Sequence, residues 1–248
     1  MLDSSVTVGD GTVTLTAKKE STNGKPHSSG MLSSHNTFRV SSGYVEARIK
    51  MPTRRGSWPA FWMPRDGWPP EIDVMEYPLF TTETTNDTYS VNNFWAGTGP
   101  PSDFLWVDRN IDLSAAYHNY GWKLDSTGLD FYFDGALVKH GNYKSDFYNM
   151  YLIFNYAVGG WPGSPNAAQW DGGQMDETRA DWIRVWQTAP STSSSTWNLV
   201  STATGSWDTA ANWSGAIPNY DRQQVVLPTL AGARTWNSDG AGHGPSVQ

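Results

Sequence analysis

Three acidic residues lie within six positions of one another in the segment EIDVME, at Glu71, Asp73 and Glu76. The other residues of the segment are apolar, as in a β-strand whose successive side chains point to opposite faces of a sheet. Glu71 and Asp73 would then share one face, about 7 Å apart, and Glu76 would point to the other. One extra residue near Val74–Met75, a β-bulge, would bring Glu76 onto the same face. We therefore predict a bulged strand that presents all three acids together.

Clustered carboxylates indicate chemistry, because their mutual repulsion costs stability. Two carboxyl groups about 5–5.5 Å apart can cleave a glycosidic bond with retention of configuration, since one attacks the sugar and the other protonates the leaving oxygen. A third carboxyl can hydrogen-bond the nucleophile and keep the two pKa values apart. The spacing alone fits a solvated acidic strand edge or a calcium site equally well, since carboxylates also bind hard cations.

Aromatic side chains surround the acids, at Trp58, Phe61, Trp62, Trp68 and Tyr77. Flat apolar rings can stack on the C–H faces of sugars. The segments WPAFWM and EIDVME resemble the six-residue, bulged signature of family-16 glycoside hydrolases and its flank. This form belongs to laminarinases, which are endo-β-1,3-glucanases, and to agarases and carrageenases. The resemblance extends from Val6 to Gln187.

The resemblance implies a role for each acid: Glu71 as nucleophile, Glu76 as acid/base and Asp73 as an assisting carboxylate. It also implies an all-β fold, a concanavalin-like β-sandwich jelly roll with an open groove that binds a polysaccharide along its length and cleaves it internally. The residues expected to contact the sugar are Trp58, Trp62, Trp68, Asn93, Trp95, Asn155 and Trp161. The chemistry needs no cofactor. Asp181 and the backbone of Gly43 match the ligands of a structural calcium that family members often bind, so this ion is kept open as an expectation.

The substrate is less defined than the reaction. Laminarinases usually carry a histidine in the strand after the signature, where this chain has Asn92, Asn93 and Trp95. A neutral amide can hydrogen-bond sugar hydroxyls but cannot titrate near neutral pH. We expect β-1,3-glucan of the laminarin type first and a galactan of the agarase or carrageenase type second. A non-catalytic carbohydrate-binding jelly roll is the third alternative, although binding alone gains nothing from three clustered acids.

The composition limits the partners. The 248 residues carry a formal net charge of −7 and no basic cluster, which argues against nucleic acid and anionic membranes. The chain has no cysteine, and no apolar run is long enough to span a membrane. Residues 1–10 lack the apolar region of a signal peptide. The resemblance implies an extracellular or cell-surface enzyme, and we expect a monomer that binds a polysaccharide.

Three regions are expected along the chain: a jelly roll over residues 1–187, a Ser/Thr-rich linker over 188–196 and a partial β-repeat-like tail over 197–248. The first region begins with a predicted hairpin over 6–17, whose outer edge would be unpaired because family members usually have an earlier strand. The tail resembles the opening of repeat modules in bacterial surface proteins, and we expect part of 197–230 to add strands to the jelly roll. Alternating apolar residues predict a further strand over 41–52, and the segment over 180–187 resembles the closing strand of the family.

Overall fold

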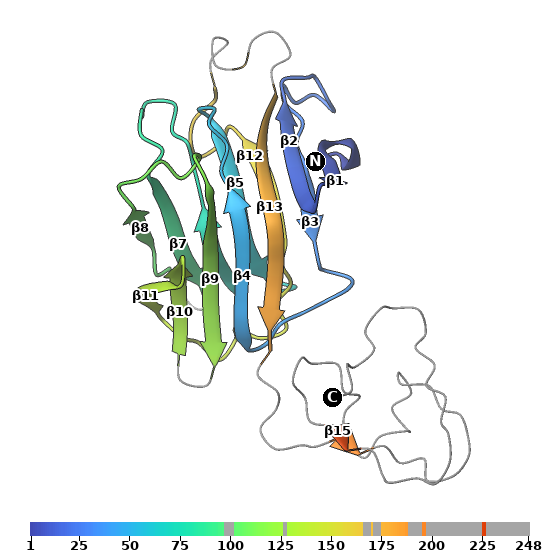
Figure 1. Ribbon diagram of the computed structural model, residues 1–248, viewed down its shortest axis with the longest axis vertical. Coiled ribbons are helices and arrows are strands. Elements are labelled where there is room, and N and C mark those ends of the chain that lie inside the picture. Colours follow the sequence, from blue (N-terminus) through green and yellow to red (C-terminus); the bar gives the residue numbers. More distant parts are fainter. Residues whose placement is uncertain are drawn as a thin grey trace, which may run out of the picture. The chain divides into compact units, whose positions relative to one another are not determined.

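The computed structural model describes the backbone and side chains of residues 1–96, 102–125, 128–165, 170 and 175–187, and the backbone of 195–196 and 225–226. The chain divides into two units, Met1–Val185 and Trp186–Gln248. The first unit is a sandwich of two antiparallel β-sheets, which Figure 1 shows as two layers. The predicted all-β sandwich is therefore confirmed. Within the part of the chain described, no helix is long and apolar enough to cross a membrane.

One sheet has seven strands in the order β1-β2-β13-β4-β9-β10-β11. Its strands are β1 (Val6–Gly9), β2 (Thr12–Lys18), β13 (Met175–Trp186), β4 (Gly43–Lys50), β9 (Tyr117–Asp125), β10 (Gly128–Phe133) and β11 (Ala136–Gly141). A short 3-10 helix, η1 (Asp3–Ser5), precedes β1. The predicted hairpin is formed by β1 and β2, and its turn places Asp10 and Gly11 at positive φ angles of 51° and 74°. The strand β1 lies at the edge of this sheet.

The other sheet has six strands in the order β3-β12-β5-β6-β7-β8. Its strands are β3 (Met31–Ser33), β12 (Ile153–Val158), β5 (Ser57–Pro64), β6 (Glu71–Glu76), β7 (Thr88–Phe94) and β8 (Leu105–Asp108). The acidic segment is thus β6, which has a neighbour on each side. One face of this sheet packs on the core, where the apolar residues of β6 are buried.

The hydrophobic core lies between the two sheets. The strand β4 shows why: its apolar residues Val45, Ala47 and Ile49 are fully buried, while the polar residues between them are half-buried. This alternation confirms the strand predicted over 41–52. Trp122 of β9 is also fully buried, and its indole Nε1 donates to the Met63 sulfur of β5 at 2.9 Å, so it joins the two sheets.

The strand predicted over 180–187 is longer than expected. It begins at Met175, because Met175–Ala180 pair with Lys18–Val13 of β2. Residues 176–179 are all polar, so the sequence shows no apolar alternation that would predict this half of the strand.

The second unit contains two short described strands, β14 (Ser195–Thr196) and β15 (Val225–Val226), which pair with each other in parallel. The strand β15 lies in the part of the tail that we expected to add to the jelly roll, and its described partner is β14 in the linker. The rest of the region 197–248 lies outside the described residues, so its interpretation as a repeat module stays a prediction.

A core substitution tests this packing. Trp122→Ala should lower the free energy of unfolding by about 3–5 kcal/mol, because it leaves a large cavity between the sheets. Leu137→Ala on β11, where the side chain is 45% exposed, should change it by less than about 0.5 kcal/mol. Urea denaturation measures both values. Equal effects of the two substitutions would contradict the assignment of Trp122 to the core.

Candidate active site

The strand β6 carries the predicted bulge. Glu71 pairs with Phe94 of β7, and Glu76 pairs with Ser90. Six positions on β6 therefore match five on β7, and the register shifts between Asp73 and Glu76. The extra residue restores the phase, so all three acids point to the side of the sheet away from the core. This side of the six-stranded sheet is called the acid face below.

The residues between the acids fill the core. Ile72, Val74 and Met75 have 0–1% of their side chains exposed. The strand can therefore hold three carboxyl groups on one side because its other side is anchored by apolar packing. The predicted bulge near Val74–Met75 is confirmed by the register with both neighbouring strands.

Glu76 is held by an indole. The Nε1 of Trp58 on β5 donates to Glu76 Oε1 at 3.1 Å. Burial raises the pKa of Glu76 to about 7, and the negative charge of Glu71 acts in the same direction. The indole of Trp58 and the hydroxyl of Ser90 oppose this rise, since they favour the ionised form. Glu76 thus has the pKa of a group that can give and take a proton near neutral pH.

Glu71 has a similar contact at the other end of the strand. The Nε1 of Trp68 donates to Glu71 Oε2 at 3.1 Å. Burial raises the pKa of Glu71, and hydrogen bonds from Trp68 and Asp73 lower it. Two indole donors, one at each end, thus orient the two glutamates.

Asp73 is the most buried of the three acids, with 3% of its side chain exposed. Burial raises its pKa well above the ordinary value, and the charges of Glu76 and Glu71 add to the rise. A hydrogen bond between Asp73 and Glu71 raises the pKa of Asp73 further and lowers that of Glu71, so a proton shared by the two is favoured on Asp73. The arrangement therefore favours a proton on Asp73 over one on Glu71 and gives Glu76 a pKa of about 7.

Several of the predicted sugar-contact residues lie on the acid face. Trp62 pairs with Asp73, and its Nε1 donates to Asn155 Oδ1 at 2.7 Å. Asn155 pairs with Ala60, which pairs with Glu76. Trp161 is 40% exposed, and its ring centroid lies 5.6 Å from that of Trp58.

Two of the predicted sugar contacts, Asn93 and Trp95, lie on the core side of the sheet. Asn93 is fully buried and pairs with the core residue Ile72, so it points away from the acid face. Its Nδ2 donates to the backbone oxygen of Asn142. The neighbouring Asn92 pairs with Asp73 and takes its place on the acid face. Trp95 packs against the core, with the Lys144 ammonium 4.8 Å from its ring centroid.

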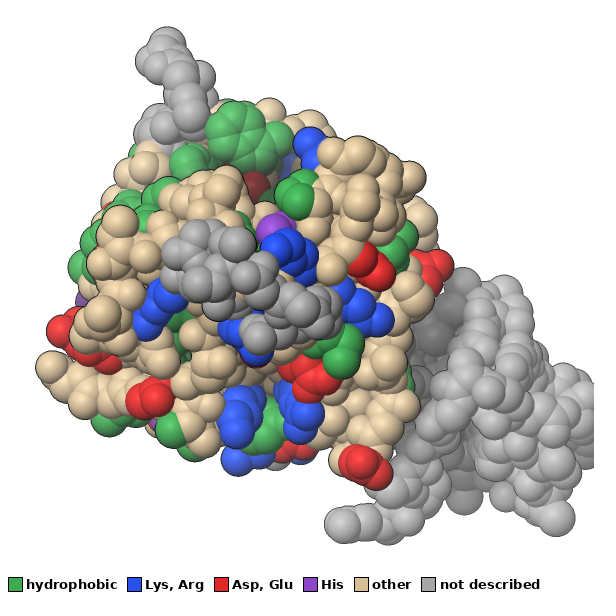
Figure 2. Space-filling view, turned by 90° about the horizontal axis from the view of Figure 1, so that it is seen from above, with side chains coloured by type: hydrophobic (Ala, Val, Ile, Leu, Met, Phe, Trp, Pro, Cys, Tyr) green, Lys and Arg blue, Asp and Glu red, His purple; other side chains and the backbone are tan. Residues whose placement is uncertain are grey.

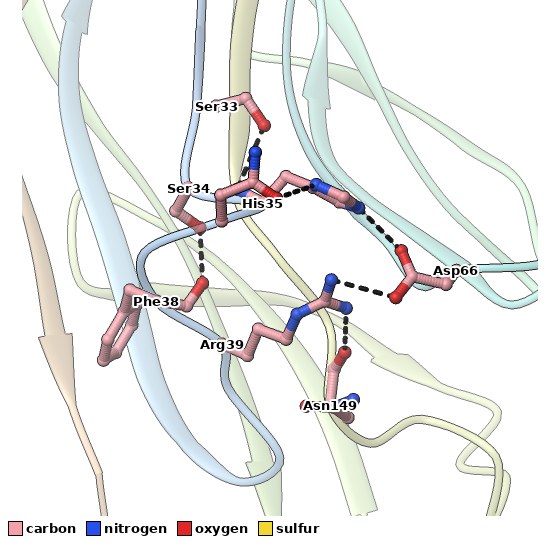
Figure 3. A network of polar contacts seen from close by, with 8 residues as sticks. Ser33, Ser34, His35, Phe38, Arg39, Asp66 and Asn149 are labelled. Atoms are coloured by element: carbon pink, nitrogen blue, oxygen red, sulfur yellow. Dashed lines mark hydrogen bonds and ion pairs between the residues drawn. The ribbon is translucent and has the colours of Figure 1, made fainter.

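The turn that carries Trp68 is tied to two other loops, as Figure 3 shows. Asp66 accepts from His35 Nε2 at 2.8 Å and from an Arg39 guanidinium nitrogen at 2.9 Å. The same guanidinium donates to the backbone oxygen of Asn149 at 3.1 Å. These contacts connect the turn between β5 and β6 to the segments before β4 and β12, and so fix where Trp68 meets Glu71.

The structure does not assemble the predicted calcium site. The carboxylate of Asp181 pairs with Arg48 at 2.5 Å. Arg48 is five residues along β4 from Gly43, which corresponds to about 17 Å of extended strand. Asp181 and Gly43 therefore lie apart, and Asp181 already has a cationic partner. Among the residues described, no group of three or more His, Asp or Glu side chains is arranged to hold a metal ion.

Sequence reasoning missed two aromatic residues, Phe104 and Trp106, which join the predicted sugar contact Trp161 at the β8 edge of the acid face. Phe104, Trp106 and Trp161 are 40%, 42% and 40% exposed, and they form what we call the aromatic platform. Phe104 and Trp106 lie in the apolar run 104–107, in which Val107 is buried and Leu105 is 37% exposed, so no alternation in the sequence identifies them. A second aromatic pair, Trp68 and Phe94, lies beside Glu71 with ring centroids 5.7 Å apart.

The surface charge is mixed where Figure 2 displays it. Lys and Arg side chains are interspersed with Asp and Glu on this face, with apolar side chains between them. This face presents no extended basic field of the kind that attracts nucleic acid.

Comparisons with known proteins agree with this geometry. The chain is 35% identical over 188 residues to the endo-1,3-1,4-β-glycanase EglC of Rhizobium meliloti. The alignment covers 72% of this chain and 39% of that enzyme, so the chain spans well under half the length of this relative.

Two solved structures are similar as well. The laminarinase catalytic domain of Thermotoga maritima is 26% identical, with a TM-score of 0.64 over 76% of this chain and 82% of that one. The mixed-linkage glucan PUL GH16 of Bacteroides ovatus, in complex with a G4G4G3G product, is 25% identical, with a TM-score of 0.64 over 74% of this chain and 86% of that one. The model of glycosyl hydrolases family 16 matches residues 2–184, most of the chain, and the chain therefore belongs to this family.

Proposed function

We propose that this chain is a retaining endo-glycoside hydrolase that cleaves internal bonds of a β-1,3-glucan or a mixed β-1,3-1,4-glucan. The observation that carries the proposal is the bulge that aligns Glu71, Asp73 and Glu76 on one face, with a pKa of about 7 at Glu76. The glucan substrate is supported by the relatives, which are named as an endo-1,3-1,4-β-glycanase and a laminarinase. A galactan stays the second candidate, because the galactan endo-β-1,3-galactanase of Flammulina velutipes is 32% identical over 137 residues.

In the first step, the Glu71 carboxylate attacks the anomeric carbon of the sugar. The bond from this carbon to the glycosidic oxygen breaks, and Glu76 gives its proton to the leaving oxygen. The product is a glycosyl ester on Glu71 and a shortened polysaccharide with a free hydroxyl. Trp68 and Asp73 hold Glu71 ready for the attack, because each donates a hydrogen bond to it.

In the second step, water hydrolyses the ester. Glu76, now ionised, takes a proton from the water as the water oxygen attacks the anomeric carbon, and Glu71 leaves as a carboxylate. Esterification removes the charge of Glu71, which is one cause of the raised pKa of Glu76. The pKa of Glu76 should fall in the intermediate, so the same residue is better suited to act as a base at that stage.

The remaining proposals concern the sugar contacts, the location and the oligomeric state of the enzyme. Trp62 and Asn155 provide an apolar ring and an amide beside the acids, and a sugar needs both kinds of partner. A polysaccharide cannot enter a cell intact, which supports action outside the cell or at its surface. We also propose that the enzyme works as a monomer, because all three acids and both indole donors come from one chain.

A substrate panel tests the function. Release of reducing ends should be rapid with laminarin or barley mixed-linkage glucan and absent with agarose and carrageenan. Glu71→Gln and Glu76→Gln should each lower turnover by about 10³-fold or more, because an amide neither attacks nor donates as an acid does. Asp73→Asn should cost less, since the amide can still donate a hydrogen bond. Cleavage of agarose with no cleavage of either glucan would contradict the proposed substrate.

The pH profile tests the assignment of the proton donor. The value of kcat/KM should fall above about pH 7, because Glu76 must be protonated to act as the acid. It should also fall at low pH, where Glu71 loses its charge. With an aryl glycoside whose leaving group needs no proton, Glu76→Gln should lose the alkaline limb and keep the acidic one. An alkaline limb that persists in this variant would show that another group titrates there.

A further inference from the structure

The indole of Trp68 is placed by a turn more than by core packing. It donates to Glu71 Oε2 at 3.1 Å, although 52% of the Trp68 side chain is exposed. The turn covers residues 65–70, between the end of β5 and the start of β6. Its ends are joined by a long hydrogen bond, from the Arg65 N–H to the backbone oxygen of Pro70 at 3.4 Å. The contact between Trp68 and Glu71 therefore depends on what else holds this turn.

Asp66 ties the turn to the segment 34–39 (Figure 3). One oxygen of its carboxylate lies 2.8 Å from His35 Nε2, and the other accepts from the Arg39 guanidinium at 2.9 Å. The hydrogen bond with His35 and the charge of Arg39 lower the pKa of Asp66. Asp66 therefore stays ionised at the pH values where a glutamate of the site titrates.

The two partners of Asp66 are themselves held in place. The guanidinium of Arg39, whose side chain is 22% exposed, lies 5.1 Å from the centre of the Tyr151 ring. His35 meets the same ring edge-on, with the ring centroids 4.5 Å apart. The backbone N–H of Tyr151 donates to the oxygen of Pro64, the last residue of β5, at 3.0 Å. The partners of Asp66 are thus fixed relative to the strand from which the turn departs.

The contacts of Asp66 affect position more than stability. The side chains of Asp66 and His35 are 61% and 43% exposed, so solvent screens their interaction and it contributes little to the free energy of unfolding. A displacement of the turn by about 1 Å, in contrast, would take the indole of Trp68 out of hydrogen-bonding range of Glu71. Loss of the Asp66 contacts should therefore change the site while the fold persists.

We propose that Asp66 is a positioning residue for the nucleophile, because it holds the turn from which Trp68 donates to Glu71. His35 and Arg39 are the groups through which Asp66 acts. The proposal rests on the proposed function for the role of Glu71 and adds a residue outside the acid face to the machinery of the site.

The direction of the effect distinguishes positioning from charge. The hydrogen bond from Trp68 lowers the pKa of Glu71, so its loss should raise that pKa and move the acidic limb of kcat/KM to higher pH. Removal of the negative charge of Asp66, acting through space alone, would lower the pKa of Glu71 and move the limb to lower pH. The charged groups beside Glu71, which are Asp73 and Glu76 of the same strand, stay unchanged in each variant described below.

The kinetic test is the substitution Asp66→Asn. It should lower kcat/KM on a β-glucan roughly fivefold on the acidic side of the optimum and less than about twofold on the alkaline side. Trp68→Phe should have the same effect, and the double variant should lose no more, because the hydrogen bond is already absent. The temperature of unfolding should stay within about 2 °C of the parent's. An acidic limb that moves to lower pH, or losses that add in the double variant, would overturn the proposal.

The matched control is Asp130→Asn on β10 of the other sheet. Asp130 has a similar contact, 2.7 Å from His140 Nδ1, so its substitution also removes an acid that is paired with a histidine. The acidic limb should stay in place in this variant. An equal shift in Asp66→Asn and Asp130→Asn would show a general effect of charge and overturn the positioning role.

A second measurement needs no turnover. In ¹H–¹⁵N NMR spectra, the indole resonance of Trp68 is identified by its absence in Trp68→Phe. It should shift as Glu71 titrates, and this shift should disappear in Glu71→Gln and in Asp66→Asn but persist in Asp130→Asn. A full response in Asp66→Asn would overturn the proposal, whether or not the enzyme cleaves glucan. A response that is lost only in Glu71→Gln and Asp66→Asn, in a protein that cleaves no glucan, would support the positioning of Trp68 and refute the proposed function alone.

Discussion

The site depends on a single extra residue in β6. Without the bulge, the strand could not direct Glu71, Asp73 and Glu76 to one face while Ile72 and the residues of the bulge fill the core. A regular strand that kept Glu71 on the acid face would turn Glu76 into the core, where an unpaired carboxylate is very costly. The same register decides which residues of the neighbouring strands meet the acids, because each partner on β5 and β7 is fixed by its pairing with β6.

The bulge brings together three carboxyl groups that repel one another when ionised. Their surroundings shift the pKa value of each acid by a different combination of burial, charge and hydrogen bonds. Burial raises the pKa of all three acids, but hydrogen bonds from Trp58 and Trp68 lower the pKa values of the glutamates they contact. The three acids therefore differ: the pKa of Asp73 is raised well above its ordinary value, and the pKa of Glu76 is raised to about 7. Such a cluster reduces the stability of the sheet at neutral pH, where the folded state must ionise buried acids. The apolar core on the opposite side of β6 compensates for this cost.

Much of the fold and the acid triplet could be predicted from the sequence, because both depend on local periodicity. Alternation identifies β4, and the five-residue spacing of Glu71 and Glu76 requires a bulge. Asn93 could not be placed in this way, because a shift of one residue in β7 exchanges it with Asn92.

The remaining errors involve contacts between distant segments. The pairing of Asp181 with Arg48 depends on how β13 lies beside β4, which no local pattern reveals. The aromatic platform combines residues from β8 with Trp161, which follows β12. Its relation to Glu76 appears only when β6, β7 and β8 are paired.

The most direct test of the account is azide rescue of the two glutamate variants, with the anomeric configuration of the product read by NMR. In Glu76→Ala, azide should attack the glycosyl ester on Glu71 and give a β-glycosyl azide. In Glu71→Ala, azide should displace the leaving group directly and give the α-azide. The opposite pair of products would exchange the roles of the two residues and contradict the account.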